Sequence, residues 1–509
     1  MTLLSLIPIV LILVLMVGWQ WSAFRAGAAG YLSALVVAVL FFNTGPLVLA
    51  YAHARAAFLI VDVLLIIWGA FLFYRVVDEA GGIEVLGEVL PRLTGERGMQ
   101  ALLIGWAFAS FLQGVGGFGV PVAVIAPLLV GLGFSPLSAV VIPSIGHSWA
   151  VTFGSLGSSF NAMMVATGMA WDVLAGPAAL FLGAACLGAG AAVAHTAGSW
   201  STVRRLLVPI LVMGGLMAAA QYAAAVWGLW NIGGFLGGSV GIAAGVVFAW
   251  WRNRQNTFEE PLPVSRRQLF TALSPYLVLI VLTLVVQLIA PLREILGRWV
   301  IGVDFPETTT GAGFVVPGGK GREIIPLRHA GMILALSALG AYLTFFVSGW
   351  YQPGAVKRVF SSLVTRLISS SVGIAAMVMM AVIMQHAGMT DQLARGISQT
   401  AGRFFPFLSP WLGALGAFMT GSNTNSNLVF SLLQMRTAEV LGFPAALILA
   451  AQTAGGALGS VIAPTKVIVG ASTAGMAGKE GEVMRRLLPP MGILILFISL
   501  LTGWGVYLR

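Results

Sequence analysis

Charged residues are scarce in this chain. Only 9% of the 509 residues are Asp, Glu, Lys or Arg, whereas 58% are hydrophobic, and the mean hydropathy is +0.95. Soluble domains carry about 25% charged residues, so this composition excludes a soluble globular protein. It predicts an all-α integral membrane protein. At roughly 20 residues for each spanning helix, the chain has room for about 11 to 14 membrane segments.

Cysteine and catalytic motifs are also missing. The single cysteine, Cys186, cannot form a disulfide within the chain. The sequence has no His-Glu-x-x-His zinc motif, no Gly-x-Ser-x-Gly nucleophile motif at a strand–helix turn and no Asp-rich pyrophosphate motif, so no catalytic residue, metal or cofactor is expected. The net charge of +10 would suggest nucleic acid in a soluble protein. Here the basic residues gather in short loops, as the positive-inside rule describes, so the expected partner is the lipid bilayer.

Two regions of the chain do not form clean spans. In residues 99–170 and 407–475, glycine, proline, serine and asparagine interrupt the apolar runs, and glycine and proline at this density break helices. The basic loop 251–267 is expected in the cytoplasm and the loop 293–330 outside. The expected organisation is a scaffold of spans with an amphipathic link at 1–98, a first interrupted repeat at 99–196, scaffold spans and loops at 197–406, and a second interrupted repeat with the last span at 407–509.

The stretch Gly-Ser-Asn-Thr-Asn-Ser-Asn at 421–427 lies between two apolar runs. Seven small or amide residues cannot form a lipid-facing helix, and irregular backbone survives at membrane depth only when buried in protein or lining a wet cavity. We therefore predict a break in a discontinuous helix, where the side chains hold a small polar solute. The alternative is an extramembrane loop.

The two interrupted regions resemble each other. Phe-Leu-Gln-Gly at 111–114 matches Phe-Met-Thr-Gly at 418–421, and an apolar run to Leu-Gly-Phe follows each, at 132–134 and 441–443. Paired interrupted segments in two halves of a chain are the best sequence indication of a transporter site. A carrier whose solute lies between two broken-helix repeats is therefore predicted.

A lysine and several amides are the candidate ligands for that solute. Lys466 at membrane depth would cost about 3 kcal/mol unless paired or hydrated, so we predict that it binds a carboxylate; a snorkelling lysine is the alternative. His147 is a candidate proton relay or a packed, hydrogen-bonded histidine. The amides suit a hydroxyl, a carboxylate or a sodium ion. The predicted substrate-binding residues are Gln113, Gly114, Gly117, His147, Ser148, Ser155, Ser422, Asn423, Thr424, Asn425, Asn427, Thr453 and Lys466, with His147 and Asn423 as coupling candidates.

Four charged residues, Asp62, Arg75, Asp78 and Asp172, lie near the ends of expected spans. Interfacial anchoring or pairing is the expected role for each of them.

Several segments, in order along the chain, are similar to the L-lactate permease family, which carries lactate and glycolate. The segments are Gln100–Gly119, Pro121–Ala123, Leu129–Phe134, Val151–Gly157, Thr420–Phe430, Gly455–Gly459 and Gly478–Glu480. Ser422-Asn423-Thr424 also resembles the signature of sodium-coupled carboxylate transporters. That second resemblance implies two inverted repeats with hairpins and an elevator-like alternating access.

The chain departs from the family pattern at four positions. The pattern has Glu at Gln113, Asp at Asn423, Asn at His147 and a small hydroxyl residue at Lys466. The site is therefore more positive than in the family, which puts proton coupling through those acids in doubt.

The resemblance implies a permease of the cytoplasmic membrane for an L-lactate or glycolate type of 2-hydroxymonocarboxylate, coupled to protons. The alternatives are a dicarboxylate or other more anionic solute with sodium coupling or exchange and, from other classes, an anion channel or an intramembrane enzyme. A homodimer is left open.

Overall fold

The computed structural model is helical throughout its membrane segments. It describes residues 1–508 except 18, 20, 90–93, 117–118, 253–263 and 477–478. Within these residues, 11 helices are long and apolar enough to cross a membrane, or 12 if Ser371–His386 and Met389–Thr420, bent by 77° at a break, form one broken span. This confirms a polytopic helical membrane protein at the lower end of the predicted range.

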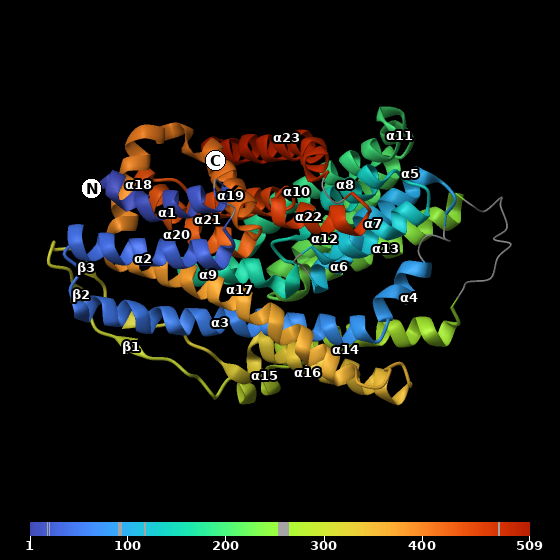
Figure 1. Cartoon of the computed structure of the whole chain (residues 1–509), viewed down its shortest axis with the longest axis horizontal. Helices are drawn as coiled ribbons and strands as arrows, with labels where there is room; N and C mark the ends of the chain where they lie inside the picture. The colour runs from blue at the N-terminus through green and yellow to red at the C-terminus, as the bar shows by residue number, and fades with distance from the viewer. Residues whose placement is uncertain are drawn as a thin grey trace.

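The elements follow one another along the chain as Figure 1 labels them. The helices before residue 200 are α1 (Thr2–Val17), α2 (Ala23–Phe41), α3 (Pro46–Glu79), α4 (Gly82–Val89), α5 (Arg97–Gln100), a π-helical turn (Ala101–Phe108), α6 (Ala109–Val115), α7 (Val120–Gly131), α8 (Pro136–His147), α9 (Ser158–Thr167) and α10 (Trp171–Gly198). The remaining elements are α11 (Trp200–Arg205), α12 (Leu207–Val226), α13 (Gly233–Arg252), α14 (Arg266–Leu288), α15 (Ala290–Leu296), β1 (Asp304–Phe305), β2 (Thr308–Thr309), β3 (Val315–Val316), β4 (Gly319–Lys320), α16 (Ala330–Val347), α17 (Ala355–His386), α18 (Met389–Ala401), α19 (Phe405–Thr420), α20 (Asn423–Leu441), α21 (Ala445–Ser460), α22 (Pro464–Thr473) and α23 (Glu480–Tyr507).

Long, uninterrupted helices surround a group of shorter ones. Helix α3 packs against α16 and α17, and α2 packs against α1 and α17. Figure 1 shows α3 and α14–α16 along one edge of the molecule and α23 along the opposite edge. Between them, α19 packs on α21, and α20 packs on both α21 and α9. The interrupted segments therefore lie inside the molecule, where neighbouring protein supplies the partners that lipid cannot give to free backbone groups.

Both interrupted regions have the same order of elements. In the first, α6 is followed by a break, α7, α8, a second break and α9; in the second, α19 is followed by a break, α20, α21, a second break and α22. The predicted Leu-Gly-Phe pairs form matching turns, because Gly133 (φ 82°) and Gly442 (φ 71°) both adopt the left-handed conformation after a helix. The inverted relation between the two regions and the four-part division of the chain stay predictions.

The break at 421–427 is shorter than predicted. Only Gly421 and Ser422 leave the helix, and Asn423 begins α20. Gly421 has φ 69°, and a Cβ there would also collide with the Thr465 side chain, so both conformation and space require glycine. Ser422 then caps α20, since its side chain accepts a hydrogen bond from the Asn425 backbone. The amides remain helical because buried neighbours provide the hydrogen bonds that lipid would not.

The loop at 293–330 contains all the strands among the described residues. It forms two antiparallel two-stranded sheets, β1 with β4 and β2 with β3, in register at Asp304↔Lys320 and Thr308↔Val316. Figure 1 shows this loop running back toward the N-terminus along α3.

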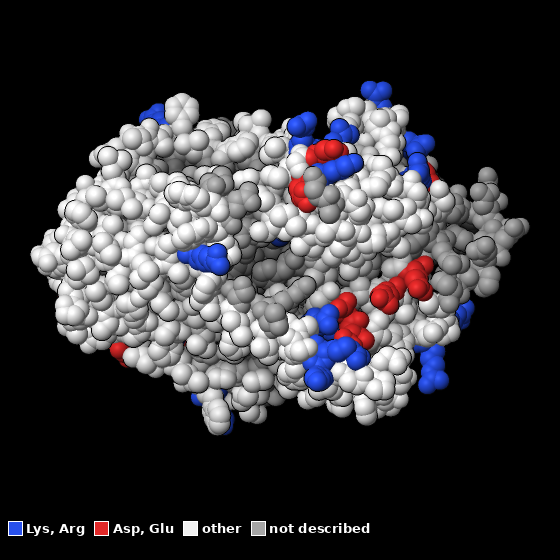
Figure 2. All heavy atoms as spheres, viewed as in Figure 1, with Lys and Arg blue, Asp and Glu red and all other residues white. Residues whose placement is uncertain are grey.

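The loop predicted to be cytoplasmic, 251–267, lies mostly outside the described residues. Figure 2 shows that most of the charged side chains on the visible face lie over the half that contains α5 and α11 in Figure 1. Arg97, Arg204 and Arg205 belong to these helices; the side of the membrane that this end faces stays a prediction.

A glycine seam joins α19 to α21. A Cβ at Gly455 would collide with the carbonyl oxygen of Pro410, and Gly413 and Gly459 make similar contacts. Such small residues let helix backbones approach closely in membranes.

Gly455→Val is therefore expected to lower the monodisperse fraction of detergent-extracted protein roughly ten-fold, because α19 and α21 must separate. Gly215→Val is the control, since no atom lies within 4 Å of a Cβ at that position; equal loss in both variants would contradict the seam.

Candidate functional site

The two interrupted regions meet at one small polar cavity. It is enclosed by the ends of α6 and α22, by the break before α9 and by the break before α20. It encloses about 20 Å³, which is room for about one water molecule. The described residues that line it are Gln113, Val151, Ser155, Ser158, Ser159, Gly421, Ser422, Asn423, Thr424 and Lys466.

Asn423 connects the two regions at the start of α20. Its Nδ2 donates to Thr152 Oγ1 at 3.0 Å and to the carbonyl and Oγ1 of Thr453 at 3.3 Å each. The two threonine hydroxyls also bond each other at 3.1 Å. All three side chains are buried. Asn423 therefore links α20 to α21 and to the second break of the first region through hydrogen bonds that its side chain donates.

Two further contacts tie α20 to α9. Thr424 Oγ1 lies 3.0 Å from Ser159 Oγ, and Asn427 Nδ2 donates to the Ser159 carbonyl and to Thr453 Oγ1, both at 2.9 Å. The break before α9 depends on Ser155 and Leu156, which have φ 46° and 54°. Non-glycine residues rarely adopt this left-handed conformation. The hydroxyls of the first region are thus held in place by an unusual backbone.

Four amide oxygens remain unbonded in this region. Gln113 Oε1, Asn423 Oδ1, Asn425 Oδ1 and Asn427 Oδ1 are buried and have no hydrogen-bond partner among the described residues. Buried polar atoms in folded proteins are nearly always hydrogen-bonded. The unpaired oxygens therefore indicate that a polar or cationic ligand binds here. Gln113 and Asn423 line the cavity, whereas Asn425 and Asn427 are not among its lining residues.

Lys466 is the ionisable residue of the cavity, and no other described lining residue carries a charge. It lies in the first turn of α22, partly buried, and its Nζ donates to Ser460 Oγ at 3.0 Å. Among the described residues, no carboxylate lies within salt-bridge distance of it. An ammonium held at membrane depth without an acid requires an anion or water to balance it.

Four other predicted residues are not among the described residues that line the cavity. Ser148 bonds the Ile145 carbonyl, and His147 Nδ1 lies 2.6 Å from the Pro143 carbonyl while its buried Nε2 has no partner among the described residues. Neither lines the cavity. Gly114 faces the Phe235 backbone, and Gly117 lies outside the described residues. The part that these four play in binding stays a prediction.

Thr152 and Ser159 were missed by the sequence reasoning as site residues. Both lie in or beside the second break of the first region, where small polar residues cluster. That cluster is the one feature of the sequence that could have identified them as site residues. Their roles depend on partners about 270 to 300 positions away in the chain, which no local pattern identifies.

Asp62 lies in the middle of α3 rather than near a span end, which corrects the sequence expectation. Helix α3 is 34 residues long, and residue 62 stands near its midpoint. Asp62 is 1% exposed. Its carboxylate accepts hydrogen bonds from Asn161 at 2.9 Å, His329 at 3.1 Å and Arg322 at 3.2 Å. This cluster joins α3, α9 and the loop after β4.

Replacing Asn423 tests the polar connection. Asn423→Leu removes the donor to Thr152 and Thr453 and leaves the Thr453 carbonyl without that bond, which costs about 1–3 kcal/mol. We expect transport of the small polar solute predicted from the sequence to fall roughly 30-fold in proteoliposomes, with the protein still monodisperse. Ser431→Ala is the matched control, because this buried hydroxyl on α20 has no partner among the described residues. Normal uptake by Asn423→Leu would remove Asn423 from the site.

Comparisons with known proteins find a match along the whole chain. The L-lactate permease family model matches residues 1–509. The L-lactate permease of Bacillus subtilis (strain 168) is 28% identical over 541 residues, covering 98% of this chain and 94% of the relative. The glycolate permease GlcA of Escherichia coli (strain K12) is 28% identical over 527 residues, covering 95% and 91%.

A solved structure, that of the Alcanivorax borkumensis YdaH transporter, has 17% sequence identity and a TM-score of 0.48, covering 90% of this chain and 87% of that one. The match to the family model extends over the whole length of the sequence and confirms the resemblance noted from the motifs. The chain therefore belongs to the L-lactate permease family, a family of multi-pass transporters of the cytoplasmic membrane and not of enzymes.

Proposed function

We propose that this protein is a secondary transporter for a small 2-hydroxymonocarboxylate of the L-lactate or glycolate type. The observation that carries the proposal is Lys466, an ammonium without a carboxylate partner among the described residues, in a cavity where two broken-helix regions meet. The relatives named L-lactate permease and glycolate permease support the same substrate class.

The chemistry of the cavity favours a monoanion. Lys466 supplies one positive charge, which one carboxylate balances. A second carboxylate would be buried without a partner among the described lining residues, and an unpaired buried charge is costly. The unbonded oxygens of Gln113 and Asn423 can accept a hydrogen bond from the 2-hydroxyl group. The site thus distinguishes a 2-hydroxy acid from its deoxy analogue, because the analogue leaves these acceptors unpaired.

The size of the cavity requires movement. A volume of about 20 Å³ is too small for lactate, so binding requires the walls around α6, α9, α20 and α22 to separate. Alternating access by an elevator-like displacement of the interrupted regions against α2, α3, α16 and α17 would open the cavity to each side in turn. Sodium fits the same picture, because the unbonded amide oxygens suit it. His147 is the candidate for a coupling proton, and it stands outside the cavity lining.

The test is uptake into proteoliposomes over a panel of anions. We expect saturable uptake and counterflow of L-lactate and glycolate, with propionate and succinate at least roughly ten-fold poorer. Varying sodium and pH separately identifies the coupling ion. Uptake without counterflow would indicate a channel, and preference for succinate would indicate a carrier for more anionic solutes; either result would overturn the proposal.

A further inference from the structure

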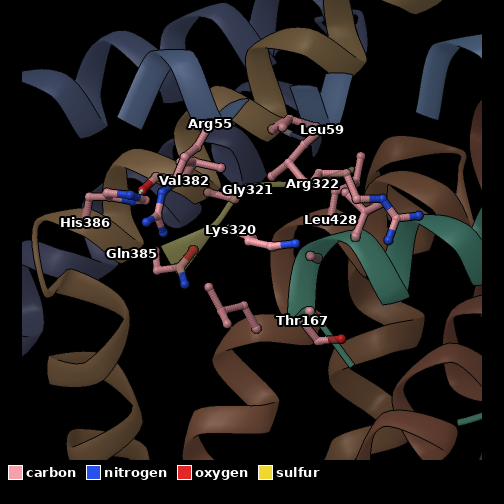
Figure 3. Close-up of a pocket in the computed structure, with 16 residues that line it drawn as sticks. Arg55, Leu59, Thr167, Lys320, Gly321, Arg322, Val382, Gln385, His386 and Leu428 are labelled. Carbon is pink, nitrogen blue, oxygen red and sulfur yellow. Dashed lines mark hydrogen bonds between the residues drawn. The ribbon is translucent and has the colours of Figure 1, made fainter. Parts of the chain in front are cut away.

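A second cavity, about ten times larger, lies between α3 and α17 on one side and α9 and α20 on the other. It encloses about 200 Å³, and the loop after β4 closes part of it. Figure 3 shows Arg55, Lys320, Arg322, Gln385 and His386 around it. All four ionisable residues that line it are basic or histidine, and no acid is among the described lining residues.

Arg55 is the cation of this cavity without an acidic partner. Its Nη2 donates to the Pro317 carbonyl at 3.2 Å, and the guanidinium lies 4.8 Å from the centre of the Phe305 ring. Among the described residues, no carboxylate forms a salt bridge with it, and its buried Nε has no hydrogen-bond partner. A guanidinium stacked on an aromatic ring with a free donor is well suited to a carboxylate.

The neighbouring basic groups also offer donors. Arg322 pairs with Asp62, but its buried Nε has no partner among the described residues. His386 is 2% exposed; its Nδ1 bonds the Val382 carbonyl at 2.9 Å, and its Nε2 is unpaired among the described residues. Lys320 bonds Glu323 at 3.1 Å, which raises the pKa of the lysine and keeps it cationic. Three buried nitrogens without partners among the described residues therefore belong to residues that line one basic cavity.

The cavity lies one helical turn from the polar site. Leu428 of α20 lines the large cavity and Thr424 lines the small one, and four residues of helix span about 6 Å. On α9, Ser159 lines the small cavity and Val165, six residues later, lines the large one, a rise of about 9 Å along the helix. The loop that closes the large cavity is the one predicted to lie outside. A solute from that side would meet the basic cavity before the Lys466 site.

We propose that this cavity is a second carboxylate-binding site, an outer antechamber in which Arg55 captures a small organic anion. That the anion is the transported lactate or glycolate rests on the proposed function; the affinity for carboxylates does not. Basic clefts with low-dielectric walls raise the local concentration of anions and their association rates by 10-fold or more.

Cysteine labelling tests the antechamber without requiring transport. The chain has one cysteine, the buried Cys186, so Gln385→Cys in a Cys186→Ala background places one accessible thiol in the cavity. We expect an anionic sulfonatoethyl methanethiosulfonate to react faster with this thiol than a cationic trimethylammonium analogue. L-Lactate or glycolate should slow the reaction. Adding Arg55→Gln should reduce the rate ratio roughly ten-fold and remove the protection.

Arg436→Gln is the matched control, because Arg436 lies on α20 outside the lining and pairs with Asp391 and Glu439. Labelling in which Arg55→Gln changes neither the rate ratio nor protection by any small carboxylate overturns the antechamber. If that result accompanies normal lactate uptake, only the antechamber fails. If labelling behaves as expected but lactate and glycolate are not taken up, the antechamber stands and the proposed substrate fails.

Discussion

Lys466→Gln is expected to reduce the initial rate of L-lactate uptake roughly 100-fold. The glutamine keeps most of the length and polarity of the side chain but cannot balance a carboxylate, and loss of one partner of a buried charge pair costs about 2–5 kcal/mol. Its bond to Ser460 is retained by the amide, so the fold should persist. The measurement is uptake into proteoliposomes normalised to the amount of inserted protein.

Lys479→Gln is the matched control for this substitution. Lys479 is an exposed lysine just before α23, and its replacement should leave uptake within about two-fold, since surface charges contribute little. If Lys466→Gln retains more than half of the uptake, the ammonium is a snorkelling group and the site must be sought elsewhere.

Asp62→Asn is expected to have the largest effect on stability. The change leaves Arg322 and His329 without their shared carboxylate, and breaking a buried pair costs about 3–5 kcal/mol. The apparent Tm of the detergent-purified protein should therefore fall by roughly 5 °C or more. Asp391→Asn is the control: its pair with Arg436 spans 3.6 Å at the surface, and such pairs contribute about 0–1 kcal/mol.

A double-mutant cycle separates the pair from the packing around Asp62. In Asp62→Asn/Arg322→Gln neither charge remains, so part of the loss should be recovered relative to the sum of the two single changes. Additive losses, or an Asp62→Asn protein as stable as the wild type, would show that the cluster does not hold the loop to α3 and α9.

Much of the membrane fold is readable from the sequence because lipid imposes simple rules. Scarce charge and long apolar runs give the class and the number of spans, and a polar run such as 421–427 must find partners inside the protein. Lys466 is recognisable for the same reason, since a lysine in an apolar context needs a function or a route to water. These features are local, because lipid makes each unpaired charge or polar group costly wherever it stands in the sequence.

The remaining features depend on contacts between distant parts of the chain. The sequence shows an acid at Asp62 but not that His329 and Arg322, about 260 positions later, fold back onto it. The helical conformation of Asn423–Asn427 likewise depends on Thr152, Ser159 and Thr453, which supply the hydrogen bonds of the asparagines. A short-range pattern suggested a longer break because it contains no information about these partners.

Equilibrium binding of L-lactate to the purified protein tests the central claim most directly. Isothermal titration of the wild type, Lys466→Gln and Lys479→Gln at neutral pH compares the proposed site with its control. Saturable binding by the wild type and Lys479→Gln that weakens roughly 100-fold in Lys466→Gln is the predicted result. Equal affinity in all three proteins would contradict a carboxylate held by Lys466 between the two interrupted regions.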